Sequence, residues 1–223
     1  MNSLPMMHLL QLVSPALPVG AYAYSQSLEH AVDTGWVTNE DEAFDWMQGL
    51  LLNSLAKTDL PILERLYLSW MTEQIDDALY WNNYLCALRE TAELEAEDFQ
   101  MGQALKRLLV DLNIAHADVL KSINPCSYAT VFSFACVRWE VSKEEALLAY
   151  VFSWAENQIA AGIKLIPLGQ TSGQRLLQKI MPVIEKAIIN SLTINEEKIG
   201  ASLPAMSLAS SLHETQYSRL FRS

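Results

Sequence analysis

The 223-residue sequence has little glycine and little cysteine. Its eight glycines form no Asn-Gly or Asp-Gly pair. Those pairs are the strongest short signal for a β-hairpin, so their absence disfavours an all-β fold. The three cysteines, Cys86, Cys126 and Cys136, are odd in number, and no two have the close spacing of a zinc site. We therefore expect buried, reduced thiols.

Positive charge is missing from the first part of the chain. Six acidic residues precede the first cation, Lys57. A secretory signal begins with a positively charged region, so the apolar opening segment does not fit one, and Pro15 and Pro18 interrupt it. The longest apolar run, Leu147–Ala155, is about half the length of a membrane span. We expect a cytoplasmic protein.

Composition and charge limit the partners. The chain is 51% hydrophobic and 18% charged, which excludes a disordered protein. A net charge of -11 disfavours nucleic acid and anionic membranes as main partners and favours basic or mixed-charge proteins. The length suits a single domain spanning residues 1–223.

Helix start and stop signals predict an all-α, single-domain bundle of roughly eight to ten helices. The expected segments are a helix over 24–34, one after Thr38 or Asn39, one restarting at Asp59–Pro61, a long region 77–113 broken near Glu93–Asp98, one from Ser142 to Lys164, and one over Arg175–Leu192 after a capping pattern at Thr171–Gln174. Pro182 should kink the last of these. Ala129–Trp139 and Leu147–Ala155 are apolar nearly all round, so we expect them at the centre.

No catalytic or metal-binding pattern is complete. The Gly169–Gly173 loop lacks the Lys-Ser/Thr ending of a phosphate loop and follows a helix instead of a strand. His213-Glu214 begins like a zinc-protease motif, but Tyr217 stands where its second histidine should be. We predict no catalytic residue, no bound metal and no cofactor.

Two features leave alternatives open. Glu29 and Asp33 lie four residues apart on one helix face, where they form either a solvated acidic face or a site for a cationic partner group or a transient metal contact. Lys164 lies in an apolar run; it either complements the last carbonyls of its helix or presents a charge beside the Gly169–Gln174 loop.

The last eleven residues, His213–Ser223, favour a docking tail. They carry a net charge of +1 on a chain of net charge -11, and they hold residue types that are enriched at binding hot spots. We expect this tail to be mobile in the free protein and ordered on a partner.

Three segments together resemble one family, the urease accessory protein UreF. They are SPALPVGAYAYSQSLEHAVDTGWV (Ser14–Val37), AGIKLIPLGQTSGQRLL (Ala161–Leu177) and HETQYSRLFRS (His213–Ser223). Their order, spacing and terminal position match that family over the whole chain. Three residues depart from the pattern: Ala21 and Ser27 stand where the family commonly has glycine, and Ala23 where it has serine.

The resemblance implies a non-enzymatic, all-α homodimer that acts as a chaperone in urease maturation. It implies binding to UreD (UreH in some organisms), recruitment of the GTPase UreG, and docking on urease apoprotein for nickel insertion. Carried over by position, the tail contacts are Tyr217, Arg219, Leu220, Phe221 and Arg222. Glu29, Asp33 and Lys164 match family positions expected to face partners. Gln170 and Gln174 belong to the family's Gly-Gln-x-x-x-Gln loop and are also expected to contact partners.

Two other functions stay open at this point. The chain could be a GTPase activator that supplies an arginine to UreG. It could also be a helical metal-dependent hydrolase that uses Glu29, His30 and Asp33. Any nickel contact should be weak and passing, because clustered ligands of the kind that hold nickel are absent from the sequence.

Overall fold

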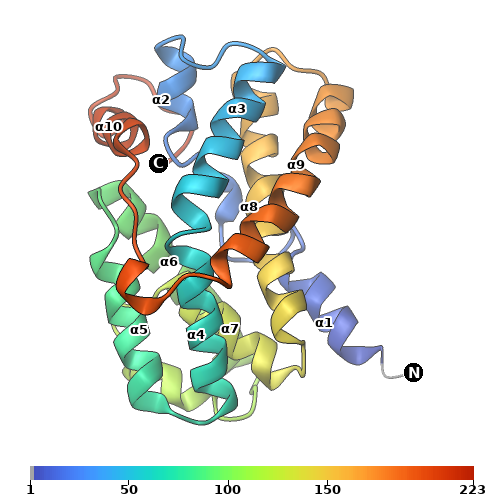
Figure 1. Ribbon diagram of the computed structural model, residues 1–223, viewed down its shortest axis with the longest axis vertical. Coiled ribbons are helices and arrows are strands. Elements are labelled where there is room, and N and C mark those ends of the chain that lie inside the picture. Colours follow the sequence, from blue (N-terminus) through green and yellow to red (C-terminus); the bar gives the residue numbers. More distant parts are fainter. Residues whose placement is uncertain (1–2) are drawn as a thin grey trace.

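Helices account for all the regular structure in residues 3–223, the part of the chain that the computed structural model describes. The α-helices are α1 (Leu4–Leu12), α2 (Leu28–Asp33), α3 (Glu40–Leu50), α4 (Asp59–Met71), α5 (Ile75–Ala87), α6 (Ala92–Asp111), α7 (Tyr128–Arg138), α8 (Lys143–Leu165), α9 (Gln170–Ser191) and α10 (Pro204–His213). Short 3₁₀ turns occur at Ala21–Ala23, Ala117–Ser122 and Glu196–Lys198, and a π-helical turn, Leu51–Leu55, continues α3. The prediction of a single all-α domain is confirmed (Figure 1).

Helix α7 forms the centre of the molecule. Its residues Tyr128–Cys136 are all buried, and α4, α6 and α8 pack around it. The indole of Trp70 on α4 donates to the Thr130 carbonyl at 3.1 Å, which satisfies a polar group inside the core. Along one side α8 runs beside α9 (Figure 1). The central position expected for Ala129–Trp139 is confirmed.

Several helix ends follow the sequence signals. Asn39 caps α3 by accepting from two backbone N–H groups, and Ser142 and Glu145 form the expected capping box at the start of α8. The expected cap at Thr171–Gln174 is wrong, because α9 already begins at Gln170 after Gly169. Pro182 lies inside α9, which continues through it to Ser191.

Two other boundaries differ from expectation. The helix predicted over 24–34 is confined to α2, because Gln26 and Ser27 adopt left-handed backbone angles that no α-helix contains. The long region 77–113 breaks between α5 and α6, ahead of the charged Glu93–Asp98 patch. Thr91 caps α6 there, and Glu93 falls in its first turn, where a carboxylate favours the helix.

The three cysteines are free. Cys126 and Cys136 are buried as expected, whereas Cys86 is half-buried. Burial raises the pKa of the Cys86 thiol to about 11 and that of Cys126 to about 12. Both thiols are therefore protonated and unreactive near neutral pH.

None of the helices in residues 3–223 combines the length and the apolar character that crossing a bilayer requires.

Candidate functional site: the C-terminal tail and its anchor

The C-terminal tail, residues 213–223, runs from the end of α10 to α2 and the segment before it. In Figure 1 the C-terminus lies beside α2 and α10, at the upper end of the view. Helix α10 packs against both α2 and α6, so residues from three helices surround the start of the tail.

Glu29 on α2 anchors the tail. The Leu220 N–H donates to Glu29 Oε1 at 2.6 Å, and the Phe221 N–H donates to Oε2 at 2.8 Å. The same Oε2 lies 3.1 Å from His213 Nε2. Glu29 is only 7% exposed, so these charge-assisted hydrogen bonds form away from bulk water and compensate its desolvation.

His213 connects this anchor to α6. Its side chain is fully buried, with Nδ1 at 2.8 Å from Glu93 Oε2 and Nε2 facing Glu29. Each ring nitrogen therefore faces one carboxylate. Arg219 lies on the solvent side of this cluster and pairs with Glu93, with Nη1 at 2.9 Å from Oε1.

The last two residues are held by the segment that precedes α2. The Arg222 N–H donates to the Ala23 carbonyl at 2.8 Å, and the Ser25 N–H donates to the Ser223 carbonyl at 2.7 Å. Ser223 Oγ donates to Glu97 Oε2 at 2.9 Å. Burial raises the pKa of the Glu97 carboxyl to about 7, although hydrogen bonds from Gln26 and Ser223 act in the opposite direction.

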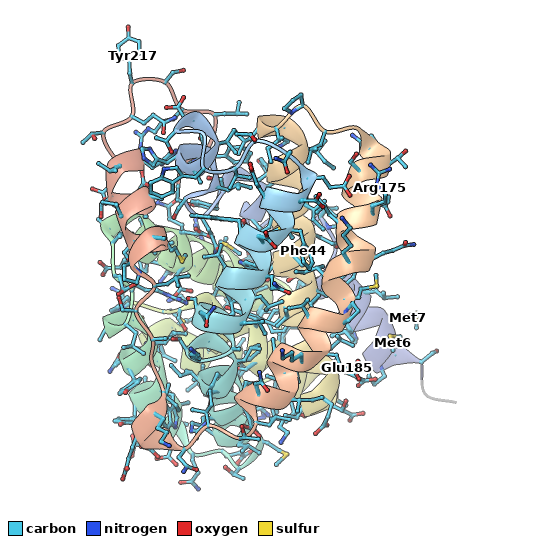
Figure 2. All side chains as sticks on the ribbon, turned by 45° about the horizontal axis from the view of Figure 1, so that its top comes forward. Met6, Met7, Phe44, Arg175, Glu185 and Tyr217 are labelled. Atoms are coloured by element: carbon cyan, nitrogen blue, oxygen red, sulfur yellow. The ribbon has the colours of Figure 1, made fainter. Side chains whose placement is uncertain are left out.

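The side chains of the tail divide into an inward and an outward set. Phe221 is buried, with the Lys164 ammonium 5.3 Å from the centre of its ring. Tyr217 is fully exposed and projects away from the body at the tip of the tail (Figure 2). Leu220 is 65% exposed, and Arg219 and Arg222 are also exposed. Hydrogen bonds thus hold the backbone of residues 220–223, while the side chains of Tyr217, Arg219, Leu220 and Arg222 are exposed.

The expectation of a mobile tail is wrong for residues 220–223, which are bonded to Glu29, Ala23 and Ser25. No local pattern predicts this contact, because the acceptors lie almost two hundred residues away. Glu93, Glu97 and His213 were missed for the same reason. Only the fold brings α2, α6 and α10 together.

Glu29 and Asp33 do not form one acidic face. Glu29 is buried on the tail, so the solvated-face interpretation is wrong for it, whereas Asp33 is exposed. His30 lies near the tail as well, with Nδ1 3.4 Å from Gln216 Oε1. Asp33 is exposed, and among the described residues Glu29, His30 and Asp33 do not form a group that could hold a metal ion, as the hydrolase alternative requires.

Lys164, Gln170 and Gln174 lie on the other side of the tail region. Lys164 is in the last turn of α8, and both glutamines are in the first turns of α9. All three are exposed. Lys164 contacts the tail through Phe221, a role that neither of its two sequence interpretations included. The start of α9 lies at the same end of the molecule as the tail (Figure 1).

A cavity of about 330 Å³ lies beneath the segment that leads to α2. Its charged lining includes Asp59, Arg89, Glu97 and Asp98. Arg89 bonds both Asp59 (2.8 Å) and Asp98 (3.0 Å), so these carboxylates are already paired. Across residues 3–223, no group of three or more His, Cys, Asp or Glu side chains is placed to hold a metal ion.

Comparisons with known proteins identify the family. The UreF family model matches residues 37–181, which is more than half of the chain. The chain belongs to the UreF family. Urease accessory protein UreF of Teredinibacter turnerae is 48% identical over 218 residues, covering 98% of each chain. The proteins of that name from Alkalilimnicola ehrlichii (47% over 215 residues, 96% of this chain and 94% of the relative) and Hahella chejuensis (46% over 223 residues, all of both chains) are also similar.

The departures from the UreF pattern have local consequences. Ala21 lies in the 3₁₀ turn Ala21–Ala23, and the positive φ of this segment falls on the preceding Gly20 (φ +79°). Ser27 replaces the second UreF glycine but keeps a left-handed backbone, with φ +73°. Its hydroxyl donates to the Met206 carbonyl on α10 at 3.2 Å. Serine here combines backbone strain with a hydrogen bond between α2 and α10.

Proposed function

We propose that this UreF-family chain is a non-catalytic scaffold in the maturation of urease. In this proposal the tail docks on UreD (UreH in some organisms), and the chain recruits and regulates the GTPase UreG. As a homodimer it brings both partners to urease apoprotein for nickel insertion in the cytoplasm. One observation supports the docking role most: Tyr217, Arg219, Leu220 and Arg222 of the tail are exposed, while Glu29 holds the backbone at Leu220 and Phe221.

A fixed display of this kind suits recognition. Part of the entropy cost of ordering a docking segment is already met in the free chain, which favours tight association. Exposed Tyr and Arg side chains are the types that dominate binding energy at interfaces. Leu220, 65% exposed beside them, offers apolar area that a partner can bury.

The experiment removes the outward side chains and keeps the anchor. The double variant Tyr217→Ser/Leu220→Ser should weaken binding to purified UreD by about 10- to 100-fold, because two exposed hot-spot side chains are lost. Leu208→Ser on α10 is the matched control, since Leu208 is 52% exposed outside the tail. Isothermal titration with each variant measures the dissociation constants. Point variants are preferable to truncation after Leu212, which would remove the fully buried His213.

Unchanged affinity in the double variant would show that the tail is not the docking segment. Equal weakening by Leu208→Ser would show that loss of any exposed apolar side chain weakens binding, and that the effect is not specific to the tail.

The exposed residues Lys164, Gln170, Gln174 and Asp33 are proposed as a second set of partner contacts, suited to the GTPase. Gln170→Ala/Gln174→Ala should change UreG turnover in the assembled complex while binding of UreD stays the same. Gln178→Ala, an exposed glutamine further along α9, is the control. GTP hydrolysis by the purified chain without any partner would contradict the non-catalytic role.

A further inference from the structure

A second cleft gathers positive charge on this acidic protein. Its volume is about 670 Å³, and no carboxylate lines it. We call it the cationic cleft. Its charged lining consists of Lys106 and Arg107 on α6, Lys121 in the 3₁₀ turn Ala117–Ser122, and Arg222 in the tail. Four of the chain's fifteen cations thus face one hollow on a protein of net charge -11.

Lys106 is the most unusual of these cations. It is only 9% exposed, and its ammonium donates to the Ile123 carbonyl at 2.9 Å. Within residues 3–223 that carbonyl is its one hydrogen-bond acceptor, and no carboxylate pairs with it. An ammonium has three donors, and burying its charge without a counter-charge is costly. An anion in the cleft would satisfy the remaining donors and compensate the charge.

Arg107 and Arg222 add two guanidinium groups without carboxylate partners in the described chain. Arg107 Nε donates to the Gln103 carbonyl, and Arg222 Nη1 donates to Gln100 Oε1; both distances are 3.3 Å. A guanidinium offers five N–H donors in a fork that matches a carboxylate. Most of these donors are therefore free. Lys121 differs, because it pairs with the exposed Asp118 at 2.6 Å.

The rest of the lining suits a polypeptide. Tyr22 is 68% exposed and Phe99 is 36% exposed, which provides apolar contact area next to the cations. The amide side chains of Gln100, Gln103 and Asn124 add donors and acceptors for a backbone. Aromatic and Arg side chains with few carboxylates are typical of protein interfaces.

The charge distribution favours a protein segment over nucleic acid. Binding a nucleic acid depends on several phosphate contacts along an extended basic surface, and the strongly acidic remainder of this chain would repel its backbone. A short acidic segment brings negative charge only where the cleft is positive. We propose that the cationic cleft binds an acidic segment of a partner protein, with Lys106, Arg107 and Lys121 as its carboxylate contacts. Those three residues lie outside the tail, so variants at their positions test the cleft separately from tail docking, although Arg222 of the tail also lines it.

Peptide binding by the full chain tests the proposal. The probe is a fluorescein-labelled decapeptide of glutamates with one central phenylalanine; its glutamine counterpart, a thymidine decanucleotide and inorganic phosphate are compared with it. Fluorescence anisotropy should detect the glutamate peptide at low salt and weaker binding at high salt. Arg107→Gln and Lys121→Gln should each weaken binding about five- to tenfold, as expected for loss of one charge-assisted contact. Lys186→Gln, which removes an exposed cation from α9, is the control with the same charge change.

The side-chain amides of Gln100, Gln103 and Asn124 serve as local reporters. Their ¹⁵N-¹H signals should shift on addition of the glutamate peptide and stay in place with the glutamine peptide. In the Lys106→Met variant, whose folding is checked by thermal unfolding, the glutamate peptide should no longer shift these signals.

Four results would overturn the proposal: no binding of the glutamate peptide, equal weakening by Lys186→Gln, tighter binding of the decanucleotide through the same residues, or displacement by phosphate at peptide-like concentration. A dimer of the free chain that Arg107→Glu dissociates would assign the cleft to a contact between copies and would also overturn it.

Discussion

Two buried clusters of charge stabilise different parts of this molecule, one inside the bundle and one beneath the tail. The interior cluster consists of Arg89 between Asp59 and Asp98. Asp98 Oδ1 also accepts from the Tyr128 N–H at 2.8 Å, at the first turn of α7. The cluster therefore connects α4, the α5–α6 break, α6 and the central helix, and every one of its partners is part of the core.

The anchor cluster consists of Glu29, Glu93 and His213. Its carboxylates also accept hydrogen bonds, but two of the donors are backbone N–H groups of the tail, at Leu220 and Phe221. What it holds is a short segment whose outward side chains are exposed. Similar chemistry thus cross-links the core in one place and holds the C-terminal tail in the other. Breaking the first should unfold the protein, and breaking the second should release only the tail.

The largest effect is expected from Arg89→Met. Removing the guanidinium leaves Asp59 and Asp98 buried without a counter-charge, so the free energy of unfolding should fall by about 3–5 kcal/mol. Urea denaturation followed by circular dichroism measures it. Arg175→Met is the control, because Arg175 pairs with Glu40 on the exposed surface and should matter little. A loss no greater than that of the control would show that the interior cluster is not a cross-link of the core.

The next effect concerns Glu97, which lies between the two clusters: it neighbours Asp98 on α6 and accepts from Ser223 in the tail. Its pKa is about 7 in the folded protein against an ordinary 4.5, so folding favours its protonated form. That stabilisation is complete below about pH 4.5 and is lost as the pH rises through about 7, a change of about 3 kcal/mol.

Glu97→Gln imitates the protonated carboxyl and should remove this pH dependence. The variant should therefore be more stable than the parent at pH 8 and about equal at pH 4.5. Urea denaturation at several pH values between these limits measures the difference. Glu95→Gln, an exposed carboxyl on the same helix, should leave the pH profile of the parent unchanged. A parallel profile for Glu97→Gln and its parent would contradict the raised pKa.

The sequence predicted the helical class because helix signals are local. The Ser142–Glu145 capping box and the nearly all-round apolar character of Ala129–Trp139 each extend over one or a few turns. The helices predicted from them therefore do not depend on the rest of the fold. The helix over 24–34 failed because left-handed angles at Gln26 and Ser27 are imposed by tertiary contacts, including the Ser27 bond to Met206.

The candidate site was predictable only in part. Tail composition predicts a docking segment and the resemblance to UreF implies UreD as its partner; both stay predictions. The anchor needed long-range information, since Glu29 and the tail N–H groups that it accepts from are about 190 residues apart. A lone buried acid on a short helix looks the same in sequence as a solvated one, which is why Glu29 was open to two interpretations.

The third-largest effect is expected from Glu29→Gln and should be confined to the tail. Glu29→Gln keeps the shape of the side chain, but it removes the charge and replaces one accepting oxygen with a donating NH₂ group. One of the two tail amides, Leu220 or Phe221, therefore loses its acceptor, and the bond from the other weakens. Hydrogen exchange at these two amides should accelerate by about 10- to 100-fold, which corresponds to about 1.5–3 kcal/mol for bonds to a charged group. Exchange in α7 should stay the same. Asp33→Asn, an exposed acid on the same helix, is the control. If α7 exchanged faster to the same degree as the tail, the anchor cluster would belong to the core and the contrast between the two clusters would disappear.

The smallest effect is expected at Ser27, which directly precedes α2 and so helps to place Glu29 against the tail. Ser27 directs the chain into α2 with a left-handed backbone, which costs a non-glycine residue about 1 kcal/mol. Ser27→Gly relieves that strain and loses the bond to Met206, so its stability should be close to that of the parent. Ser27→Ala keeps the strain and also loses the bond, so it should be less stable than Ser27→Gly by about 1 kcal/mol.

At Ser211, an exposed position inside α10, the order should reverse, because alanine is the better helix former. The same order of alanine and glycine at both positions, measured by thermal unfolding, would show that the backbone at Ser27 is not strained.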